Sequence, residues 1–595
     1  MKKYKILMHM FEKEDKNRLA LLFFGILILG FTEMIGVASI VPFMGMVTDS
    51  SMIMTNSYLN YIYVNLEFES TDDFLFFSGV TVLCLMAISN LFSIFMNWNM
   101  QSFVFLQEHR IACRMIQKYL SQEYLFFLSR NSSDLSKNIL TEIGRAMSGV
   151  VLPILQVISK SIVTFMLVLL LVVADPFLAG TILLTLGSIY IFIFIIVRKV
   201  LHSIGNIAAN AISARYKILS EIFSRIKILK LKGGENEFVE WFSIPSLKYA
   251  KFSAISTVIS HAPRYLLEIV AFGGIMIIVL YLISKDQSNS YVISYMSLYA
   301  FAGYRLMPAL QQIYAGLTLV HYNFPAVEAI SIDLKLKEAK NLTRKISSDE
   351  DSVFNHSIDL TEISFKYPGA NKYLLKRVNI SIKKNSSIAI VGETGSGKST
   401  LIDIILGLHT PDEGFVCIDG CAFNEKTSMN WKRNIGYVPQ DIYLSDDTIQ
   451  NNIAFLAQEN DILLIDVINA AKTAHIHDFI MELPEQYNTK VGERGVRLSG
   501  GQKQRIGIAR ALYENPHVLV LDEATSAMDS ITEELVMNAL GSLKNKKTMI
   551  IIAHRLTTIK DCDIIYILED GNIVDAGNFD ELLATNLKFQ RMAKK

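Results

Sequence analysis

The sequence predicts an α-helical membrane domain followed by an α/β domain. Six long apolar stretches lie before residue 315, and a strand, a glycine-rich loop and a helix follow one another near residue 390. At 595 residues the chain is too long for a single domain. Its mean hydropathy of +0.32, with 51% hydrophobic residues, lies between the values of soluble and of wholly membrane-embedded chains. One half in lipid and one half in water would give this value.

Each of the six apolar stretches is long enough to cross a hydrocarbon core of about 30 Å as a helix. The stretches are Leu19–Val47, Phe74–Met96, Val150–Ala174, Phe177–Val197, Tyr265–Ile283 and Tyr291–Tyr314. A soluble protein would need an implausibly large apolar interior to bury all six. We therefore expect them to span a membrane.

The connecting segments alternate in charge, which predicts the orientation of the spans. Thr48–Asp73 contains no Lys or Arg, whereas the leading segment, Asn97–Gly149 and Arg198–Pro263 are rich in them. Because basic segments stay in the cytoplasm, we expect both termini to be cytoplasmic. The two long basic loops contain few Gly or Pro residues, so we expect the spans to continue into the cytoplasm as helices. In the outer loop, Tyr58–Leu66 would either lie on the membrane surface or cap the bundle.

Four charged residues fall within the expected spans, where an ionised side chain is costly unless it faces protein or water. They are Glu33, Lys160, Glu268 and Arg305. Each would either form a structural ion pair, extend to an interface or contact a transported substrate. Arg305 is the most central and precedes Pro308, so we favour it as a ligand of an anionic group.

Charged and polar residues from about Leu334 to Ser352 indicate a linker. We therefore expect a six-helix membrane domain at 1–333, the linker at 334–352 and the second domain at 353–595. The formal net charge is zero, which gives no reason to expect nucleic acid as a partner. Five cysteines without paired spacing predict neither a disulfide framework nor a zinc site.

The glycine-rich loop has the composition and context of a phosphate-binding loop. The apolar run Ser387–Val391 predicts a strand before it, and Leu401–Leu408 predicts a helix after it. The loop consists of Gly392, Glu393, Thr394, Gly395, Ser396, Gly397, Lys398, Ser399 and Thr400. Its backbone N–H groups would surround phosphate oxygens, Lys398 would reach the β- and γ-phosphates, and Ser399 would ligate Mg²⁺. We conclude that the chain binds a nucleotide.

Further residues downstream suit phosphoryl transfer. Asp522 ends the apolar strand Val518–Leu521 and would hold Mg²⁺, and the adjacent Glu523 would polarise the attacking water. His554 follows the strand Met549–Ala553 and would contact the γ-phosphate, although a lone His is usually structural.

Three further features are weaker when each is taken alone. Ser499, Gly500, Gly501 and Gln502 begin an expected helix and would form a second anion site. Tyr367 precedes the phosphate loop and would either stack on adenine or belong to the core. Gln440 opens a loop after a strand and is uninformative by itself.

The motifs Gly-Glu-Thr-Gly-Ser-Gly-Lys-Ser-Thr, Leu-Ser-Gly-Gly-Gln, Val-Leu-Asp-Glu-Ala-Thr-Ser-Ala-Met-Asp and Ile-Ala-His-Arg-Leu-Thr together resemble the cassette of an ATP-binding cassette (ABC) transporter. Six spans followed by one cassette resemble an exporter half-transporter. The resemblance implies six long helices that extend into the cytoplasm, fused to an α/β P-loop ABC nucleotide-binding domain.

The resemblance also assigns a role to each motif residue. It implies that Tyr367 stacks on adenine, Gln440 senses Mg²⁺, Ser499–Gln502 form the signature, Asp522 is the Walker B acid, Glu523 is the catalytic base and His554 is the switch histidine. ATP and Mg²⁺ are therefore expected. The signature of one cassette closes over ATP held by another in this family, which implies a dimer. Because no motif is degenerate, we expect a homodimer, coupled through loop ends near Tyr124–Leu128 and Ala214–Ser224.

Shorter stretches suggest the cargo. Phe31–Phe43, Lys227–Lys232 and Tyr304–Pro308 resemble the corresponding stretches of PglK-type flippases for lipid-linked oligosaccharides. This resemblance implies an ATP-driven flippase of a polyprenyl-pyrophosphate oligosaccharide in the bacterial inner membrane, with Arg305 suited to pyrophosphate. A lipid A-like glycolipid, a peptide and a hydrophobic drug remain as alternative cargoes. A non-transport cassette protein of translation or DNA repair is disfavoured by the six spans.

Overall fold

The chain forms two compact units in a computed structural model. Unit 1 comprises Met1–Gln122 and Phe127–Ala339, and unit 2 comprises Glu123–Phe126 and Lys340–Lys595. The structure describes residues 6–8, 10–48, 50–174, 176–283, 289–336, 354–423, 431–524, 530–553 and 556–593. Most of the expected linker, 334–352, lies outside the described residues.

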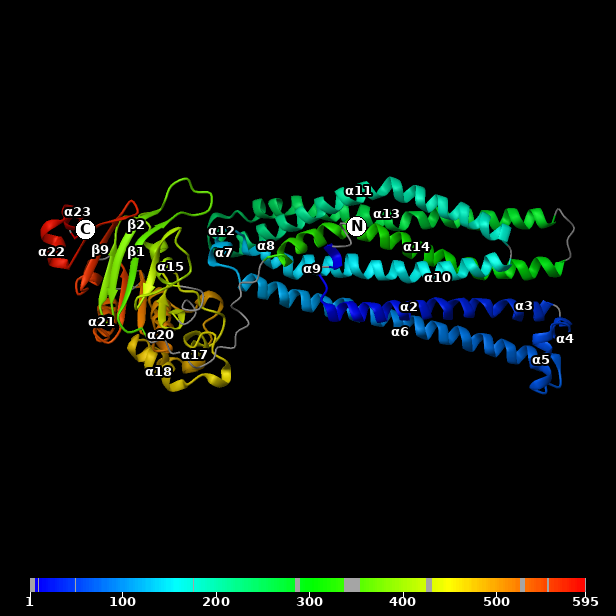
Figure 1. Ribbon diagram of the computed structural model, residues 1–595, viewed down its shortest axis with the longest axis horizontal. Coiled ribbons are helices and arrows are strands. Elements are labelled where there is room, and N and C mark those ends of the chain that lie inside the picture. Colours follow the sequence, from blue (N-terminus) through cyan, green and yellow to red (C-terminus); the bar gives the residue numbers. More distant parts are fainter. Residues whose placement is uncertain are drawn as a thin grey trace. The chain divides into compact units, whose positions relative to one another are not determined.

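Unit 1 is built from helices, which Figure 1 shows running alongside one another. The helices are α2 (Lys13–Ala38), α3 (Ile40–Thr48), α4 (Met52–Thr55), α5 (Ser57–Asn65), α6 (Thr71–Leu120), α8 (Ser132–Lys137), α9 (Ile143–Ala146), α10 (Leu152–Ala174), α11 (Pro176–Ser224), α12 (Ile226–Lys232), α13 (Glu235–Ile283) and α14 (Asn289–Leu334), with π-helical segments η1 (Asn138–Glu142) and η2 (Met147–Val151). The first residues of α7 (Tyr124–Leu128) belong to unit 2. At 1.5 Å per residue, α6 is about 75 Å long. The expectation that the spans continue as long helices is confirmed.

Four helical segments of the described residues are apolar and long enough to cross a membrane. They are Lys13–Val47, Thr71–Leu120, Ser132–Val173 and Tyr190–Ser224. No more than 33% of any apolar window is buried inside the protein, so most of these side chains are available to lipid. The last two expected spans, Tyr265–Ile283 and Tyr291–Tyr314, fall in α13 and α14. Most side chains of these two spans lie outside the described residues.

The first expected span, Leu19–Val47, is divided into two helices. Helix α2 ends at Ala38 and α3 begins at Ile40. Pro42 explains the break, because its ring lacks an N–H and clashes with the carbonyl four residues earlier, at Ala38. The side chain of Ser39 donates a hydrogen bond to Gly36 O at 2.9 Å, which satisfies a carbonyl near the end of α2.

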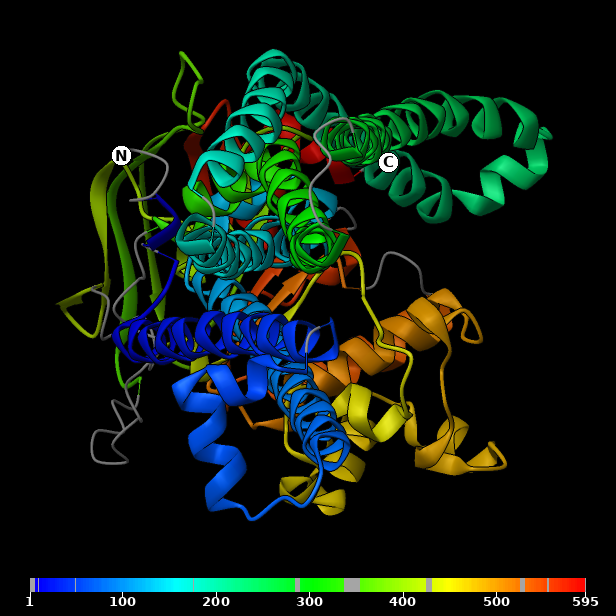
Figure 2. The same ribbon diagram turned by 90° about the vertical axis from the view of Figure 1, so that its right-hand side faces the viewer.

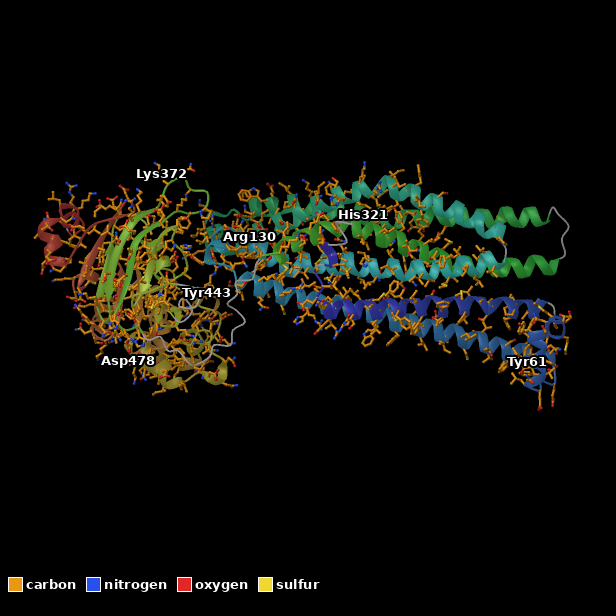
Figure 3. The ribbon with its side chains drawn as sticks, in the orientation of Figure 1. Tyr61, Arg130, His321, Lys372, Tyr443 and Asp478 are labelled. Carbon is orange, nitrogen blue, oxygen red and sulfur yellow. The ribbon has the colours of Figure 1, made fainter. Side chains whose placement is uncertain are left out.

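Helix α5 in the expected outer loop has two different faces. Leu59 and Tyr63 pack against the cluster around Phe74. Tyr58 and Tyr61 are 82% and 71% exposed, and Figure 3 shows Tyr61 at the end of unit 1 that α3, α4 and α5 form. The helix therefore covers part of the bundle with one face and presents aromatic rings on the other.

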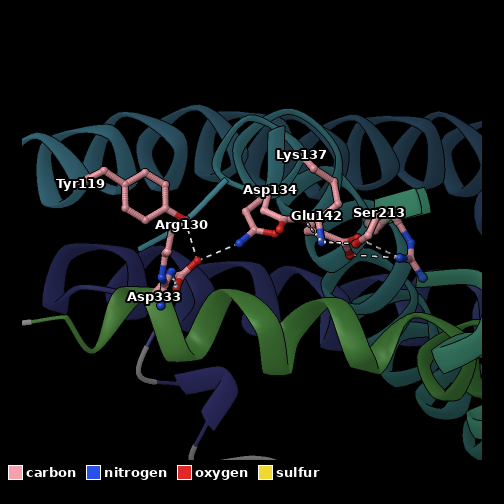
Figure 4. A network of polar contacts seen from close by, with 9 residues as sticks. Tyr119, Arg130, Asp134, Lys137, Glu142, Ser213 and Asp333 are labelled. Carbon is pink, nitrogen blue, oxygen red and sulfur yellow. Dashed lines mark hydrogen bonds and ion pairs between the residues drawn. The ribbon is translucent and has the colours of Figure 1, made fainter. Parts of the chain in front are cut away.

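A buried polar network joins four segments of unit 1 at the end of α14. The Asp333 carboxylate accepts hydrogen bonds from Tyr119 Oη at 2.6 Å, Arg130 at 2.8 Å and Asn138 at 2.8 Å (Figure 4). The Asp333 side chain is only 4% exposed. Because all its partners are donors, the carboxylate holds α6, the segment before α8 and η1 to the last turn of α14.

Unit 2 contains two β-sheets. The strands are β1 (Ser357–Phe365), β2 (Leu375–Lys383), β3 (Ser387–Val391), β4 (Glu413–Ile418), β5 (Cys421–Ala422), β6 (Ile435–Val438), β7 (Val518–Asp522), β8 (Thr548–Ile552), β9 (Ile564–Glu569) and β10 (Asn572–Gly577). The antiparallel sheet has the order β2-β1-β4-β5, and the larger sheet has the order β10-β9-β3-β8-β7-β6. Strands β6, β7, β8, β3 and β9 are parallel, and β10 is antiparallel to β9.

The central strands of the larger sheet are buried on both faces. The helices of unit 2 are α15 (Lys398–Ile405), α17 (Ile449–Ile453), α18 (Leu464–Thr473), α19 (His477–Glu482), α20 (Gly500–Tyr513), α21 (Ser530–Gly541), α22 (Phe579–Thr585) and α23 (Leu587–Ala593). Ile388 and Ile390 of β3 belong to one apolar cluster, and Ala389 and Val391 belong to the other. Two-sided burial explains why β3, β7 and β8 are continuous apolar runs rather than alternating ones.

We expect Asp333→Ala to lower the stability of the protein by about 3 kcal/mol, because Arg130 and two further donors would lose a buried carboxylate. The thermal unfolding midpoint of the detergent-solubilised protein measures the effect. Asp134→Ala is the matched control, since that side chain is 52% exposed and lies 4.0 Å from Lys137. Equal midpoints for the two variants would contradict the role given to Asp333.

Candidate functional site

The site begins at the edge of the larger sheet where the parallel strands end. The phosphate loop follows β3, Gln440 follows β6, and Asp522 ends β7. Since carboxyl ends of parallel strands meet at one edge, the topology gathers these residues although they are far apart in sequence. His554 follows β8, which ends at the same edge, but it lies outside the described residues.

The backbone of the phosphate loop requires glycine at specific positions. A Cβ atom at Gly392 would lie 2.2 Å from the carbonyl oxygen of Leu568 on β9, so no side chain fits there. Gly395 and Gly397 have φ angles of 88° and 105°, which disfavour residues with a side chain. Gly397 then caps α15, whose first residue is Lys398.

The loop presents groups that suit a phosphate. Lys398 Nζ donates to the carbonyl oxygens of Gly392 at 2.8 Å and Glu393 at 2.9 Å. Burial lowers the pKa of Lys398, while the nearby Glu523 and Asp522 act in the opposite direction. Ser396 Oγ is buried without a hydrogen-bond partner. An ammonium folded over its own loop and an unsatisfied hydroxyl fit a triphosphate, which would take up both groups.

Gln440 and Glu523 are brought together. Gln440 Nε2 donates to Glu523 Oε2 at 2.8 Å. Glu523 has a φ of 49°, in the left-handed region, and its N–H donates to Ile552 O on β8 at 3.0 Å. This conformation turns the chain sharply after β7, so that Asp522, 8% exposed, and Glu523 differ in environment. The geometry gives one buried acid for a metal and one accessible acid that contacts Gln440.

Tyr367 is tied to the phosphate loop. Its hydroxyl lies 3.0 Å from Thr400 Oγ1, and its half-buried ring meets the Phe365 ring edge-on at 5.2 Å. The ring therefore lies next to the loop that would hold the phosphates. This placement suits an adenine-stacking residue.

Ser499 begins α20, as the sequence predicts. Its hydroxyl accepts a hydrogen bond from Gln502 N at 3.3 Å, and Gln502 Oε1 accepts one from Ser499 N at 2.8 Å. This reciprocal pair is a capping box. Helix α20 packs against α17 and α18, so Gly500 and Gly501 lie at the start of a helix in the helical part of unit 2.

Two of the four charged residues of the expected spans form one pair. Lys160 Nζ lies 3.7 Å from Glu33 Oε1, and Ser93 Oγ donates to the same oxygen at 3.2 Å. Glu268 instead accepts a hydrogen bond at 2.8 Å from Arg264, one turn earlier on α13. Arg305 lies in α14, but its side chain is outside the described residues.

Two residues near the site were not singled out from the sequence. Tyr437 on β6 forms a side-chain hydrogen bond to Asp522, and burial together with that acid raises the pKa of the phenol. Burial and the charge of Asp522 raise the pKa of Asp403 on α15 to about 6. The sequence signal for Tyr437 was its place in an expected strand, three positions before Gln440. Its closeness to Asp522 depends on the pairing of β6 with β7, which the sequence does not reveal.

Comparison with known proteins supports the same interpretation. The family described as "ABC transporter" matches residues 375–526. An ATP-dependent lipid A-core flippase of Saccharophagus degradans is 34% identical over 430 residues, which cover 71% of this chain and 68% of the relative. A putative multidrug export ATP-binding/permease protein of Staphylococcus aureus is 43% identical over 235 residues, 40% of each chain.

The fold has a counterpart over almost the whole chain. The structure of a bacterial Atm1-family ABC exporter with ATP bound superposes with a TM-score of 0.76 and covers 97% of both chains. At 22% sequence identity, this likeness establishes the fold alone. The alignments with lipid A-core flippases span about two thirds of those relatives.

We expect Glu523→Gln to reduce the rate of ATP turnover at least about 100-fold, because the amide cannot accept a proton from water. Binding of a fluorescent ATP analogue should persist, since the phosphate loop is unchanged. Steady-state phosphate release and equilibrium binding measure the two effects. Glu514→Gln, at an exposed position after α20, is the control. A rate of ATP turnover in Glu523→Gln equal to that of the wild type would contradict the assignment of Glu523 as the base.

Proposed function

This chain belongs to the ABC transporter family and is an ATP-dependent exporter with its membrane domain and cassette in one polypeptide; from this premise we propose that it flips a glycolipid with a phosphate or pyrophosphate group across the membrane. The pair of a buried Glu33 and a partly exposed Lys160 is the observation that carries the proposal. An anionic head group would take Lys160 as its counter-ion within the span.

The position of this pair supports contact with a polar cargo. The Glu33 side chain is 4% exposed, whereas that of Lys160 is 27% exposed. Lys160 lies 14 residues before the end of α10 at Ala174, which corresponds to about 21 Å along the helix. Ionised groups so far within a span are usually functional, because moving a charge out of water costs free energy. The partly accessible ammonium is therefore the group that a phosphate would approach.

The exposed rings of α5 suit a lipid cargo. Tyr58 and Tyr61 combine an apolar ring with a polar hydroxyl, a combination that favours the boundary between head groups and acyl chains. Tyr58–Leu66 lies in a segment without Lys or Arg, which we place outside the cytoplasm. A long lipid chain leaving the bundle would meet this face.

We infer the ATPase mechanism from the strand edge. Ser399, Gln440 and Asp522 would hold Mg²⁺, which when bound neutralises phosphate charge. Lys398 and the loop N–H groups bind and orient the triphosphate. Glu523 accepts the proton of the attacking water, and Gln440 positions Glu523 through their 2.8 Å contact. Tyr367 orients the adenine, and His554 would contact the γ-phosphate.

We infer that the working unit is a homodimer. The resemblance to ABC exporters implies that the signature at Ser499–Gln502 of one chain closes over ATP held by the phosphate loop of another, so a second chain would complete each site. Figure 2 shows the hairpin formed by the end of α11, α12 and the start of α13 to one side of the other helices of unit 1. This hairpin exposes apolar side chains. Leu231 is 79% exposed, Trp241 56% and Ile244 70%. Such a surface in the cytoplasmic part of a helix suits a partner rather than water.

The remaining proposals concern place and boundaries. The protein is a multi-pass membrane protein, and the charge pattern of its loops favours cytoplasmic termini and a cytoplasmic cassette. Its bacterial relatives favour the bacterial inner membrane. We retain 1–333, 334–352 and 353–595 as domain limits. Coupling would use the loop ends at Tyr124–Leu128 and Ala214–Ser224.

Two glycolipids are the candidate cargoes. The stretch Phe31–Phe43 and Tyr304–Pro308 favour a polyprenyl-pyrophosphate oligosaccharide, through their resemblance to PglK-type flippases. The relatives named as lipid A-core flippases favour a lipid A-like glycolipid. Both cargoes carry phosphate on a sugar-bearing lipid, which the Lys160 ammonium suits equally.

Vesicles that contain the purified protein and one labelled lipid test the function. We expect ATP to move the labelled head group between leaflets with wild type but not with Glu523→Gln. Transfer of the polyprenyl-pyrophosphate oligosaccharide alone would identify that cargo, and transfer of the lipid A-like lipid alone would identify the other. Transfer of neither lipid despite ATP hydrolysis would contradict a glycolipid flippase and favour a drug or peptide.

We expect Lys160→Met and Arg305→Ala to lower lipid transfer about tenfold while ATP hydrolysis stays within about twofold, because each removes one charge-assisted contact to phosphate. The same vesicles measure both rates. Lys230→Gln is the control, since this lysine is 67% exposed and pairs with Glu235. Equal loss of transfer and hydrolysis would assign these residues a structural role.

A further inference from the structure

His409 is buried among aromatic side chains beside the nucleotide site. It lies after α15, and its side chain is 1% exposed. Its imidazole ring stacks on Phe365, with centroids 5.1 Å apart and an interplanar angle of 17°. It meets the ring of Tyr367 edge-on, at 5.9 Å and 90°. The ring of Tyr124, from the segment Glu123–Phe126 of the same unit, is tilted against it at 5.6 Å.

One ring nitrogen of His409 lacks a hydrogen-bond partner, while the side chain also forms a hydrogen bond to the backbone of Leu408. Nε2 is buried without a hydrogen-bond partner and lies 3.7 Å from Asp403 Oδ2. Burial lowers the pKa of His409 and so favours the neutral imidazole, while the hydrogen bond to the backbone of Leu408 and the charge of Glu123 act in the opposite direction. A neutral ring held between other rings acts through its shape. The contacts of His409 therefore concern the placement of its neighbours.

Tyr367 is the neighbour that has a proposed ligand. The Tyr367 hydroxyl lies 3.0 Å from Thr400 Oγ1, which fixes the end of the side chain. This contact does not by itself prevent rotation of the ring plane. Phe365 and His409 both meet the Tyr367 ring at nearly right angles, 85° and 90°. Because these contacts restrict the ring, less side-chain freedom is lost when a base stacks on it.

We propose that His409 is a positioning residue for adenine, which holds the ring of Tyr367 in the plane on which the base stacks. The inference rests on the proposed role of Tyr367 in the nucleotide site. The turn after α15 would then contribute to nucleotide affinity, although it lies outside the phosphate-loop motif. The effect belongs to binding of ATP rather than to the chemical step, since the ring contacts of His409 are with Tyr124, Phe365 and Tyr367.

The test compares His409→Leu with His409→Phe in the full-length protein. We expect His409→Leu to raise the KM for ATP about fivefold, the size of one lost aromatic contact, with kcat within about twofold. His409→Phe keeps a planar ring and should keep the KM. His409→Met fills the site without a ring and should behave as His409→Leu, which provides a second variant if His409→Leu does not fold. His477→Leu, at a half-buried histidine bonded to Tyr487, is the control.

A double-mutant cycle with Tyr367→Leu decides how His409 acts. If His409 acts through Tyr367, His409→Leu should add little to the KM of Tyr367→Leu. Fully additive effects, an unchanged KM in both His409→Leu and His409→Met, or an equal loss in His409→Phe would overturn the inference. Failure of the proposed nucleotide site is distinguishable, because Tyr367→Leu alone would then leave the KM unchanged.

Discussion

The close approach of Gly392 to β9 is the constraint on which the candidate site depends. With a Cβ only 2.2 Å from Leu568 O, any side chain at residue 392 would push the phosphate loop away from the sheet. The loop is short, so its start fixes where α15 begins and where Lys398 folds back. The parallel order of β3, β8, β7 and β6 then sets the distance from Lys398 to Asp522 and Glu523. One backbone contact thus locates phosphate, metal and base groups relative to one another.

Local features of this arrangement could be predicted from the sequence. Ser387–Val391 is uniformly apolar and precedes a glycine-rich loop, so the strand, loop and helix follow from short-range chemistry. The start of a helix at Ser499 was also predicted. The break at Ser39 was missed, since we expected one continuous span over Leu19–Val47, although Pro42 carries the signal for it. Each of these signals lies within a few residues of the structure it specifies.

Contacts between distant segments could not be predicted in the same way. Gln440 and Glu523 are 83 residues apart, and their contact depends on the pairing of β6 with β7. Tyr367 bonds Thr400, which is 33 residues away, and no periodicity indicates that pair. The same limit applies to Glu33 and Lys160, whose separate helices each display one charge in an apolar stretch. Only packing reveals that the two charges compensate each other.

The helices of the membrane domain differ in stiffness. Helix α6 has 50 residues and no proline, whereas α13 and α14 each contain two prolines. A helix without proline keeps its hydrogen bonds along the whole length and bends only gently. Over about 75 Å, a tilt of about 5° at one end moves the other end by roughly 6 Å, more than one helical turn. Helix α6 therefore has the dimensions of a lever, which converts a small change of angle at one end into a displacement as large as a side chain at the other.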